Sequence, residues 1–308
     1  MSTSNSNSLE ATKLIKEAEK KEGKLQSKFQ SWLGNHTQIA EETIDIYLKA
    51  TAYLKMNKNW TEAGNIYRKC AQLYLTYLKD PLESARMWDQ AAKAYKYFET
   101  KQALECYHSA VEIQMENNRF NMAAKVWKEI GTIQEKEHQL VDAQLAYQRS
   151  ADCYEAETAT LSANTSLLKV AELMTLREPA DYAGAIKVYE RMTASALENS
   201  AMKWSVKSYL FRASLCAFAV QAQLHELQPL TDQLARYAGI CPDFEGSREH
   251  ILIENLITDF NSYETEQLSS HIEQYDEISP LDPWIVTLLL SIKTCLENGN
   301  NDDGQVGV

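Results

Sequence analysis

One large side chain framed by small or apolar residues recurs through most of this chain. The framing residues lie four positions before the large one and three and four positions after it. The central positions are 19 to 22 residues apart: Tyr47, Tyr67, Trp88, Tyr107, Trp127, Tyr147, Leu167, Tyr189 and, in a weaker copy, Tyr209. A spacing this regular indicates a repeated structural unit, which constrains the fold more than any other feature of the sequence.

The offsets of −4, +3 and +4 mark one stripe of an α-helix, so each copy predicts an amphipathic helix with a large residue framed by small ones. Turn-forming residues separate the copies, for example at 57–59, 80–81, 117–118 and 178–181. Short connections make neighbouring helices antiparallel. The predicted fold is therefore all-α: a TPR-like α-solenoid of antiparallel helical hairpins, about 40 residues per hairpin.

The period ends near residue 225, and the segments 225–239, 246–260, 263–275 and 281–297 read as shorter helices with a different packing pattern. We predict a hairpin solenoid over 1–224 with an apolar loop at 28–35, a C-terminal helical bundle over 225–297, and a flexible tail over 298–308.

Only 10 glycines and 6 prolines occur in 308 residues. A chain so poor in chain-breaking residues does not build turn-dense β folds.

The formal net charge is −12, which argues against sequence-independent binding of nucleic acid, because neutralising phosphates needs a basic surface. The six cysteines lie far apart and outside zinc-ligand spacing. Apolar runs are much shorter than the roughly 20 residues that span a bilayer, and a secretory leader is not recognisable. These patterns predict a reduced, cytoplasmic protein without a metal or other cofactor.

Motifs for a phosphate-binding loop, a nucleophile elbow, a zinc protease or a dinucleotide site are missing from the sequence. An interaction protein is therefore favoured over an enzyme. Phe29, Trp32 and Leu33 lie outside the repeat register, where they either enter a membrane interface or seal the end of the solenoid. Basic residues also lie off the predicted buried stripes, where they face either solvent or an acidic partner. They are Arg119, Lys125, Lys128 and Lys169.

The chain resembles the alpha/beta class of soluble NSF attachment proteins, or SNAP family, which adapts SNARE bundles to a hexameric ATPase that disassembles them. The resemblance runs nearly end to end. It is carried by YLKMNKNW (53–60) with AGN (63–65), RF (119–120) with AAK (123–125), SAD (150–152), SAN (162–164), LLKVA (167–171), Phe244 with SRE (247–249), and YDEIS (275–279) followed by Leu281, Asp282 and Trp284.

The resemblance implies a non-enzymatic adaptor in vesicle fusion and trafficking, whose concave face lies along an assembled four-helix SNARE complex. The positions implied to bind SNAREs are Lys96, Arg119, Lys125 and Lys169. Phe29, Trp32 and Leu33 match a loop that enters the membrane, which implies a peripheral protein at the cytosolic face. The C-terminal region is implied to recruit and stimulate the NSF-type AAA ATPase, with Asp302 and Asp303 as its contacts.

The sequence departs from the family pattern on the SNARE-facing surface, in the acidic cluster and at the C-terminal end. A further SNARE-facing lysine falls on Thr165, and a basic neighbour of Lys96 falls on Tyr97. The acidic cluster near the C-terminal bundle falls on 258–262, where only Asp259 is charged, and the chain lacks the family's penultimate leucine. ATPase stimulation is therefore either weaker here or carried by other contacts.

Two alternatives to this function come from other classes of protein. One is a generic TPR-like scaffold or co-chaperone adaptor that recognises peptide termini. The other is an enzyme built on an α-solenoid. Binding to an assembled SNARE bundle but not to isolated SNARE chains separates the adaptor from the scaffold, and turnover of a substrate without any ATPase identifies an enzyme.

Overall fold

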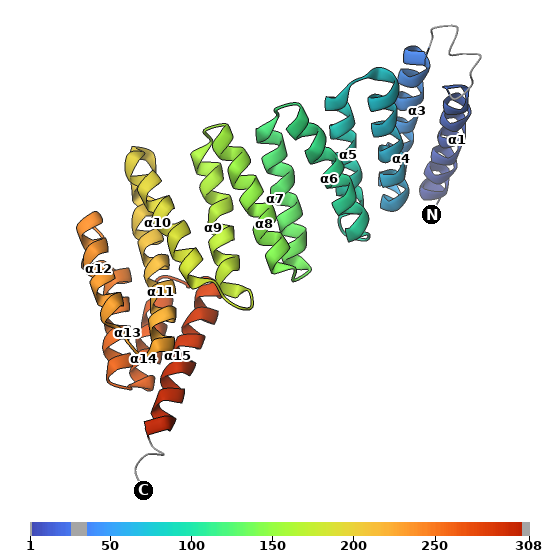
Figure 1. The fold of residues 1–308 in the computed structure, drawn as a ribbon. Helices are drawn as coiled ribbons and strands as arrows, with labels where there is room; N and C mark the ends of the chain where they lie inside the picture. Colours follow the sequence, from blue (N-terminus) through green and yellow to red (C-terminus); the bar gives the residue numbers. More distant parts are fainter. Residues whose placement is uncertain (1, 26–35, 304–308) are drawn as a thin grey trace. The chain divides into compact units, whose positions relative to one another are not determined.

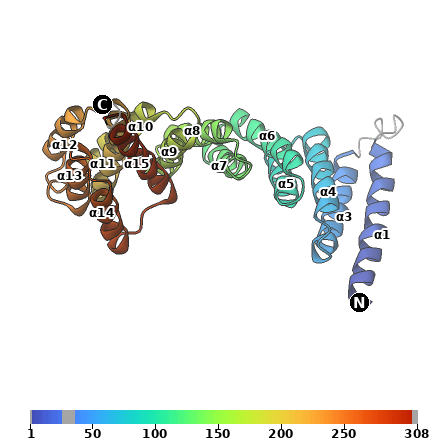
Figure 2. The ribbon, with the colours of Figure 1, turned by 90° about the horizontal axis from the view of Figure 1, so that it is seen from below.

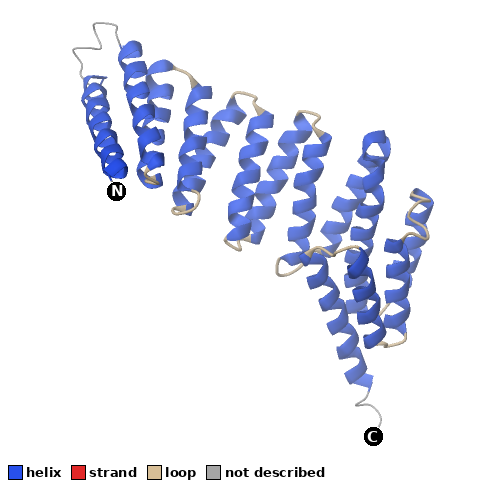
Figure 3. Cartoon of the chain, turned by 180° about the vertical axis from the view of Figure 1, so that it is seen from behind, coloured by secondary structure: helices blue, strands red, loops and turns tan. Residues whose placement is uncertain are grey.

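The computed structural model describes residues 2–25 and 36–303, with side chains described for 7–25 and 36–299. Every element in these ranges is a helix (Figure 3).

The chain forms two compact units, Met1–Ala163 and Asn164–Val308. The first unit contains α1 (Ser2–Leu25), α3 (His36–Met56), α4 (Trp60–Leu73), the π-helical turn η1 (Tyr74–Leu78), α5 (Pro81–Tyr95), α6 (Thr100–Glu116), α7 (Phe120–Lys136) and α8 (Leu140–Ala156). Helix α9 (Thr160–Leu176) begins in the first unit and ends in the second.

In the first unit, consecutive helices pack against each other and alternate in direction (Figures 1 and 2). The predicted large residues face this packing. Counted over both units, eight of the nine central residues are buried, and so are nearly all the small or apolar residues that frame them. Trp88 is only partly buried, and the guanidinium of Arg68 lies 5.9 Å from its ring centroid. The all-α solenoid of antiparallel hairpins is thereby confirmed.

The small residues of one helix make room for the next helix along the chain. Gly131 on α7 lies under the ring of Tyr147 on α8, so that a Cβ added at this glycine would lie 3.1 Å from the ring. The hydroxyl of Ser150 donates a hydrogen bond to the backbone carbonyl of Ala124 at 2.9 Å. Close backbone approach of this kind needs small side chains, which explains why the repeat keeps them beside each large residue.

Tight turns set the length of the repeat. Asn118, His138 and Thr158 each adopt a left-handed backbone conformation, with φ of 54°, 58° and 55°, at intervals that match the helical period. The residue after each of them donates its backbone N–H to a carbonyl in the helix just ended, so the helix stops and the chain reverses. Asp80 begins α5 by accepting hydrogen bonds from the backbone N–H groups of Leu82 and Glu83.

The second unit is arranged around α11. Its helices are the remainder of α9, α10 (Tyr182–Glu198), the 3₁₀ turn η2 (Ser200–Ser205), α11 (Val206–Leu224), α12 (Gln228–Ile240), α13 (Arg248–Asn261), α14 (Thr265–Ile278) and α15 (Pro283–Asp303). Helix α11 is apolar on nearly every side and packs against α10, α12, α13 and α15. A helix that is apolar all round has to lie at the centre of its unit.

Four helices lie between residues 225 and 303, as expected: α12, α13 and α14 are shorter than most of the repeat helices, whereas α15, with 21 residues, is longer than most of them. The functional boundaries at 224/225 and 297/298 stay predictions. Helix α15 continues to Asp303, and residues 304–308 lie outside the described part of the chain.

Candidate functional site

A groove of about 660 Å³ crosses the first unit, bordered by α5 and α7. Residues of α6 form its floor and Tyr154 of α8 contributes to its wall. The lining residues are Leu82, Glu83, Ala85, Arg86, Asp89, Lys93, Ala110, Gln114, Arg119, Met122, Lys125, Val126, Lys128, Glu129 and Tyr154. This groove brings together Arg119 and Lys125, two of the four residues expected to bind SNAREs.

The helical repeat positions these side chains. Helices α5 and α7 are separated by one antiparallel helix, so they run in the same direction and corresponding residues lie side by side. The lining residues of α5 extend from Leu82 to Lys93, which at 1.5 Å per residue makes the groove about 17 Å long. A groove of this length and direction can hold three turns of a helix laid along it.

The acidic groups of the groove are already paired. Arg86 donates a hydrogen bond from Nε to Glu83 at 2.8 Å, and the ammonium of Lys93 lies 2.6 Å from Asp89. Glu129 on α7 forms an ion pair with Lys96. Lys96 is thus a neighbour of the groove whose charge is compensated within the protein.

Three cations of the groove have no such partner. Arg119 precedes α7, and Lys125 and Lys128 lie on it; none of them forms an ion pair with the described part of the chain. Arg119 and Lys125 are exposed, while Lys128 is half-buried. The groove therefore keeps an excess of positive charge in a protein whose net charge is −12. Such a surface attracts an acidic partner.

Apolar side chains accompany these cations. Met122 is 47% exposed and Leu82 is 38% exposed, whereas Val126 and Tyr154 are buried beneath them. Sequence reasoning missed Met122 and Leu82 as site residues, because an apolar residue outside the buried stripe has no evident partner in the sequence. The sequence feature that could have identified Met122 and Leu82 is their position off the buried stripe, five or six residues before a central aromatic residue.

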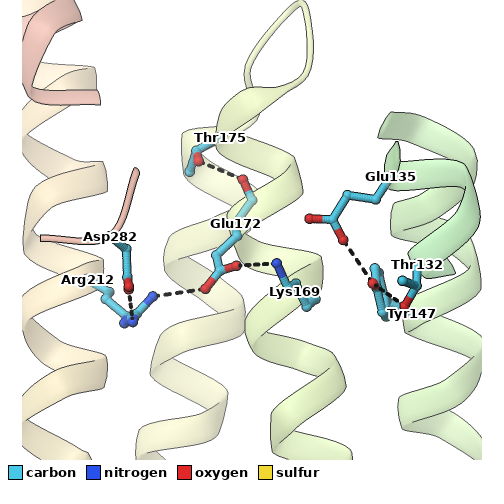
Figure 4. Close-up of polar contacts among 8 residues, drawn as sticks. All are labelled: Thr132, Glu135, Tyr147, Lys169, Glu172, Thr175, Arg212 and Asp282. Carbon is cyan, nitrogen blue, oxygen red and sulfur yellow. Dashed lines mark hydrogen bonds and ion pairs between the residues drawn. The ribbon is translucent and has the colours of Figure 1, made fainter. Parts of the chain in front are cut away.

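Lys169, the fourth expected SNARE-binding residue, lies on α9 in the second unit. Its ammonium is 3.3 Å from the carboxylate of Glu172, one helical turn further on (Figure 4). The same carboxylate accepts a hydrogen bond from Arg212 of α11 at 3.2 Å. Lys169 is half-buried and engaged in these local contacts.

Arg212 links three segments of the second unit. Besides Glu172 it donates to Asp282 at 2.6 Å (Figure 4). Its guanidinium also lies 5.3 Å from the ring centroid of Trp284. The backbone carbonyl of Asp282 accepts hydrogen bonds from the first turn of α15. Arg212 therefore fastens the beginning of α15. In the repeat it occupies the +3 position of the weak ninth copy, where small residues are usual.

The remaining expected site residues cannot be placed in the same way. Phe29, Trp32 and Leu33 lie outside the described residues. Asp302 and Asp303 are the last residues of α15, and their side chains lie outside the described part. Their roles stay predictions.

The buried thiols are not activated for chemistry. Burial raises the pKa of the Cys106 thiol to about 11, and it raises the pKa values of Cys70 and Cys216 to about 12. These groups are protonated at neutral pH, and a thiol is a poor nucleophile in that form.

The helical repeat defines an all-α protein of the solenoid class. Residues 9–297 match the family model described as "Soluble NSF attachment protein, SNAP". The chain belongs to the soluble NSF attachment protein family. The resemblance found in the sequence is thereby confirmed.

Relatives in several organisms cover nearly the whole chain. It is 36% identical to the alpha-soluble NSF attachment protein of Homo sapiens over 296 residues, which is 95% of this chain and 97% of the relative. It is 35% identical to the beta-soluble NSF attachment protein of Bos taurus, over 96% of this chain and 97% of the relative. A probable vesicular-fusion protein sec17 homolog of Neurospora crassa is 30% identical over 94% and 97%.

A solved structure titled "Functional Characterization of Pseudomonas Aeruginosa pilF" covers 80% of this chain and 97% of its own, with a TM-score of 0.37 and 14% identity. Among the described helices, none combines the length and the apolar character that a membrane span requires.

Proposed function

We propose that this protein is an adaptor that binds assembled SNARE complexes and recruits and stimulates an NSF-type AAA ATPase, which then disassembles them in vesicle fusion and trafficking. Membership of the SNAP family supports the role in NSF-dependent fusion. The observation that carries SNARE binding is the groove between α5 and α7, in which Arg119, Lys125 and Lys128 keep uncompensated positive charge. Lys96 and Lys169 complete the proposed basic contacts.

Several weak contacts have to act together in this proposal. An exposed ion pair is worth only about 0–1 kcal/mol, and salt screens it over about 10 Å at 0.1 M. A rod of four helices offers carboxylates along its whole length, so it engages several cations at once. An isolated chain offers few of them in register, and we therefore expect a strong preference for the assembled complex.

The test is retention of the protein on immobilised assembled SNARE complex, compared with retention on the isolated SNARE chains. Retention by the assembled complex alone supports the adaptor. Equal retention by isolated chains or by unrelated peptides favours the second candidate, a generic TPR-like scaffold or co-chaperone adaptor. Adding the NSF-type ATPase and ATP then measures recruitment and disassembly. The adaptor is proposed to have no catalytic activity of its own, and substrate turnover without the ATPase would argue for an enzyme.

Reversing two of the basic residues is expected to weaken SNARE binding. Lys125→Glu together with Lys169→Glu reverses two charges of the proposed contact surface, which costs about 2 kcal/mol or about 30-fold in affinity at low salt. Lys169→Glu also breaks the ion pair with Glu172. Equilibrium binding to the assembled complex measures the loss, and circular dichroism checks that the helices persist.

The matched control is Lys101→Glu together with Lys203→Glu. These lysines are exposed, lie outside the groove and change the net charge equally, one in each unit. We expect at most about a twofold effect from them, since it acts only through the screened long-range field. Equal losses in both pairs would mean that binding follows net charge and not the proposed contacts.

We also propose that Phe29, Trp32 and Leu33 hold the protein at the cytosolic face of the membrane. Each apolar group gains at most about 1.5–3 kcal/mol on burial, enough together for weak, reversible binding. Replacing all three with serine is expected to slow disassembly of liposome-anchored SNARE complexes about tenfold and to leave disassembly of soluble complexes within about twofold. Equal loss with both substrates would assign these residues a packing role.

The C-terminal contact with the ATPase is proposed for the end of α15, with Asp302 and Asp303 as the acidic groups. Helix α15 is anchored at its other end by Asp282 and Arg212, which gives the contact a fixed base. The proposed functional parts are the solenoid 1–224, the bundle 225–297 and the tail 298–308.

A further inference from the structure

Helix α7 presents an alternating row of basic and apolar residues to the groove. Arg119, Met122 and Lys125 follow one another at intervals of three residues, and all three line the groove. Residues three apart on a helix lie on the same face. Met122 therefore stands between two cations that have no ion-pair partner in the described part of the chain.

The Met122 side chain contributes little to the buried core. Its side chain is 47% exposed, while the neighbouring Val126 is 7% exposed and belongs to the core. Across the groove, Leu82 of α5 is also exposed. The two apolar side chains border a space that remains open in the isolated protein, because the groove keeps about 660 Å³.

Charge and apolar contact respond differently to salt. Attraction between exposed charges is screened over a Debye length, whereas burial of apolar surface is not weakened by sodium chloride in the same way. A groove that held its partner by lysines and arginines alone would lose it as salt rises. An apolar anchor between the cations supplies a contribution that persists.

We propose that Met122 is an apolar anchor of the groove, and that the partner segment is a helix face carrying an apolar side chain between carboxylates. This inference rests on the proposed SNARE-binding function and names the pattern that the groove reads. The flanking carboxylates pair with Arg119 and Lys125, and the apolar side chain packs on Met122. Methionine is flexible and polarizable, so it accommodates apolar residues of different shape. One adaptor can then serve bundles of different sequence.

The experiment measures the affinity of the full chain for a soluble, assembled SNARE four-helix complex at several salt concentrations. Sodium chloride is raised from about 0.05 M to about 0.3 M, which shortens the Debye length from about 14 Å to about 6 Å. The variants are Met122→Gln, Met122→Leu and Lys125→Gln. The control Leu145→Gln replaces another exposed apolar residue, which lies on α8 outside the groove. Glutamine is a good helix former and leaves α7 intact.

We expect Met122→Gln to lower the affinity about fivefold at every salt concentration, because about half of a methionine side chain no longer gains from burial. Met122→Leu keeps the affinity within about twofold, since the volume and apolar character are conserved. Lys125→Gln loses affinity mainly at low salt, so its curve converges with that of the wild type as salt rises. Leu145→Gln leaves the affinity unchanged.

Two results would overturn the inference while the proposed function stands. In the first, the wild-type chain binds and Met122→Gln binds equally well. In the second, the loss caused by Met122→Gln disappears at high salt as it does for Lys125→Gln. A wild-type chain that does not bind the assembled complex at any salt concentration overturns the proposed function, and this inference with it.

Discussion

Replacing Tyr107 with alanine is expected to lower the free energy of unfolding of the first unit by about 3–5 kcal/mol. Tyr107 is fully buried, and it is framed on its own helix by Ala103, Ala110 and Val111, which are buried as well. These small residues cannot move far enough to fill the space that an alanine leaves. The cost is therefore the lost apolar burial together with a cavity. Chemical denaturation followed by circular dichroism measures it.

Tyr107→Phe is the matched control. The Tyr107 hydroxyl is buried without a hydrogen-bond partner in the described part of the chain, so its removal is expected to change stability by less than about 1 kcal/mol or to raise it. A loss below about 1 kcal/mol for Tyr107→Ala would mean that the repeat does not depend on its large residues.

The wild type and Tyr107→Phe are also expected to differ in how their stability depends on pH. Burial raises the pKa of Tyr107 above its ordinary value of 10.0. A raised pKa in the folded protein means that folding favours the neutral phenol, so its contribution is complete below pH 10 and is lost as the pH rises further. We expect the wild type to lose stability above about pH 10 and Tyr107→Phe to lose less.

Replacing Arg212 with methionine is expected to destabilise the second unit by about 3 kcal/mol. The Arg212 side chain is 15% exposed, and its loss leaves Glu172, which is 16% exposed, without its guanidinium partner. Removing one member of a buried ion pair costs about 3–5 kcal/mol. The lower end applies here, because Glu172 keeps the ammonium of Lys169 at 3.3 Å, and because Asp282 is half exposed and water compensates its charge.

The expected structural result of Arg212→Met is local. Arg212 contacts Asp282 and Trp284 at the start of α15, so hydrogen exchange in the first turns of α15 should speed up more than in α10 or α12. Arg236→Met is the control in the same unit, since Arg236 is well exposed and pairs with Glu190 at 2.9 Å. We expect less than about 1 kcal/mol from it. Equal losses for the two variants would remove the special role of Arg212.

The repeat made the helices and their inward faces predictable. The framing of Tyr47, Tyr107 and Tyr147 by small residues placed each of them in the core, where the structure has them. Trp88 is the exception: the repeat predicts it to be buried, but its ring is partly exposed beside Arg68. The residues that frame Trp88 in the sequence follow the same pattern as those of the buried central residues, so the sequence could not distinguish it. The π-helical turn Tyr74–Leu78 could not be predicted either, since its residues are equally compatible with an ordinary α-helix.

The candidate site was predictable in part. Arg119 and Lys125 were expected at a binding face, and they do line one groove. The sequence could not predict which basic residues form ion pairs, because an ion pair such as Lys96 with Glu129 joins residues far apart in the sequence, on different helices. The same holds for Arg212, whose partners Glu172 and Asp282 come from two other segments.

The sequence by itself determined the helical class, the length of the repeat and the side of each helix that is buried, because these follow from the spacing of residues along one chain. The tertiary structure alone decided which cations stay uncompensated, where Met122 and Leu82 meet an open groove, and how α15 is fastened. The physical reason is distance. Helical periodicity acts between residues three or four apart, whereas charge pairing and groove formation depend on which helices pack side by side, and that is settled only when the whole unit folds.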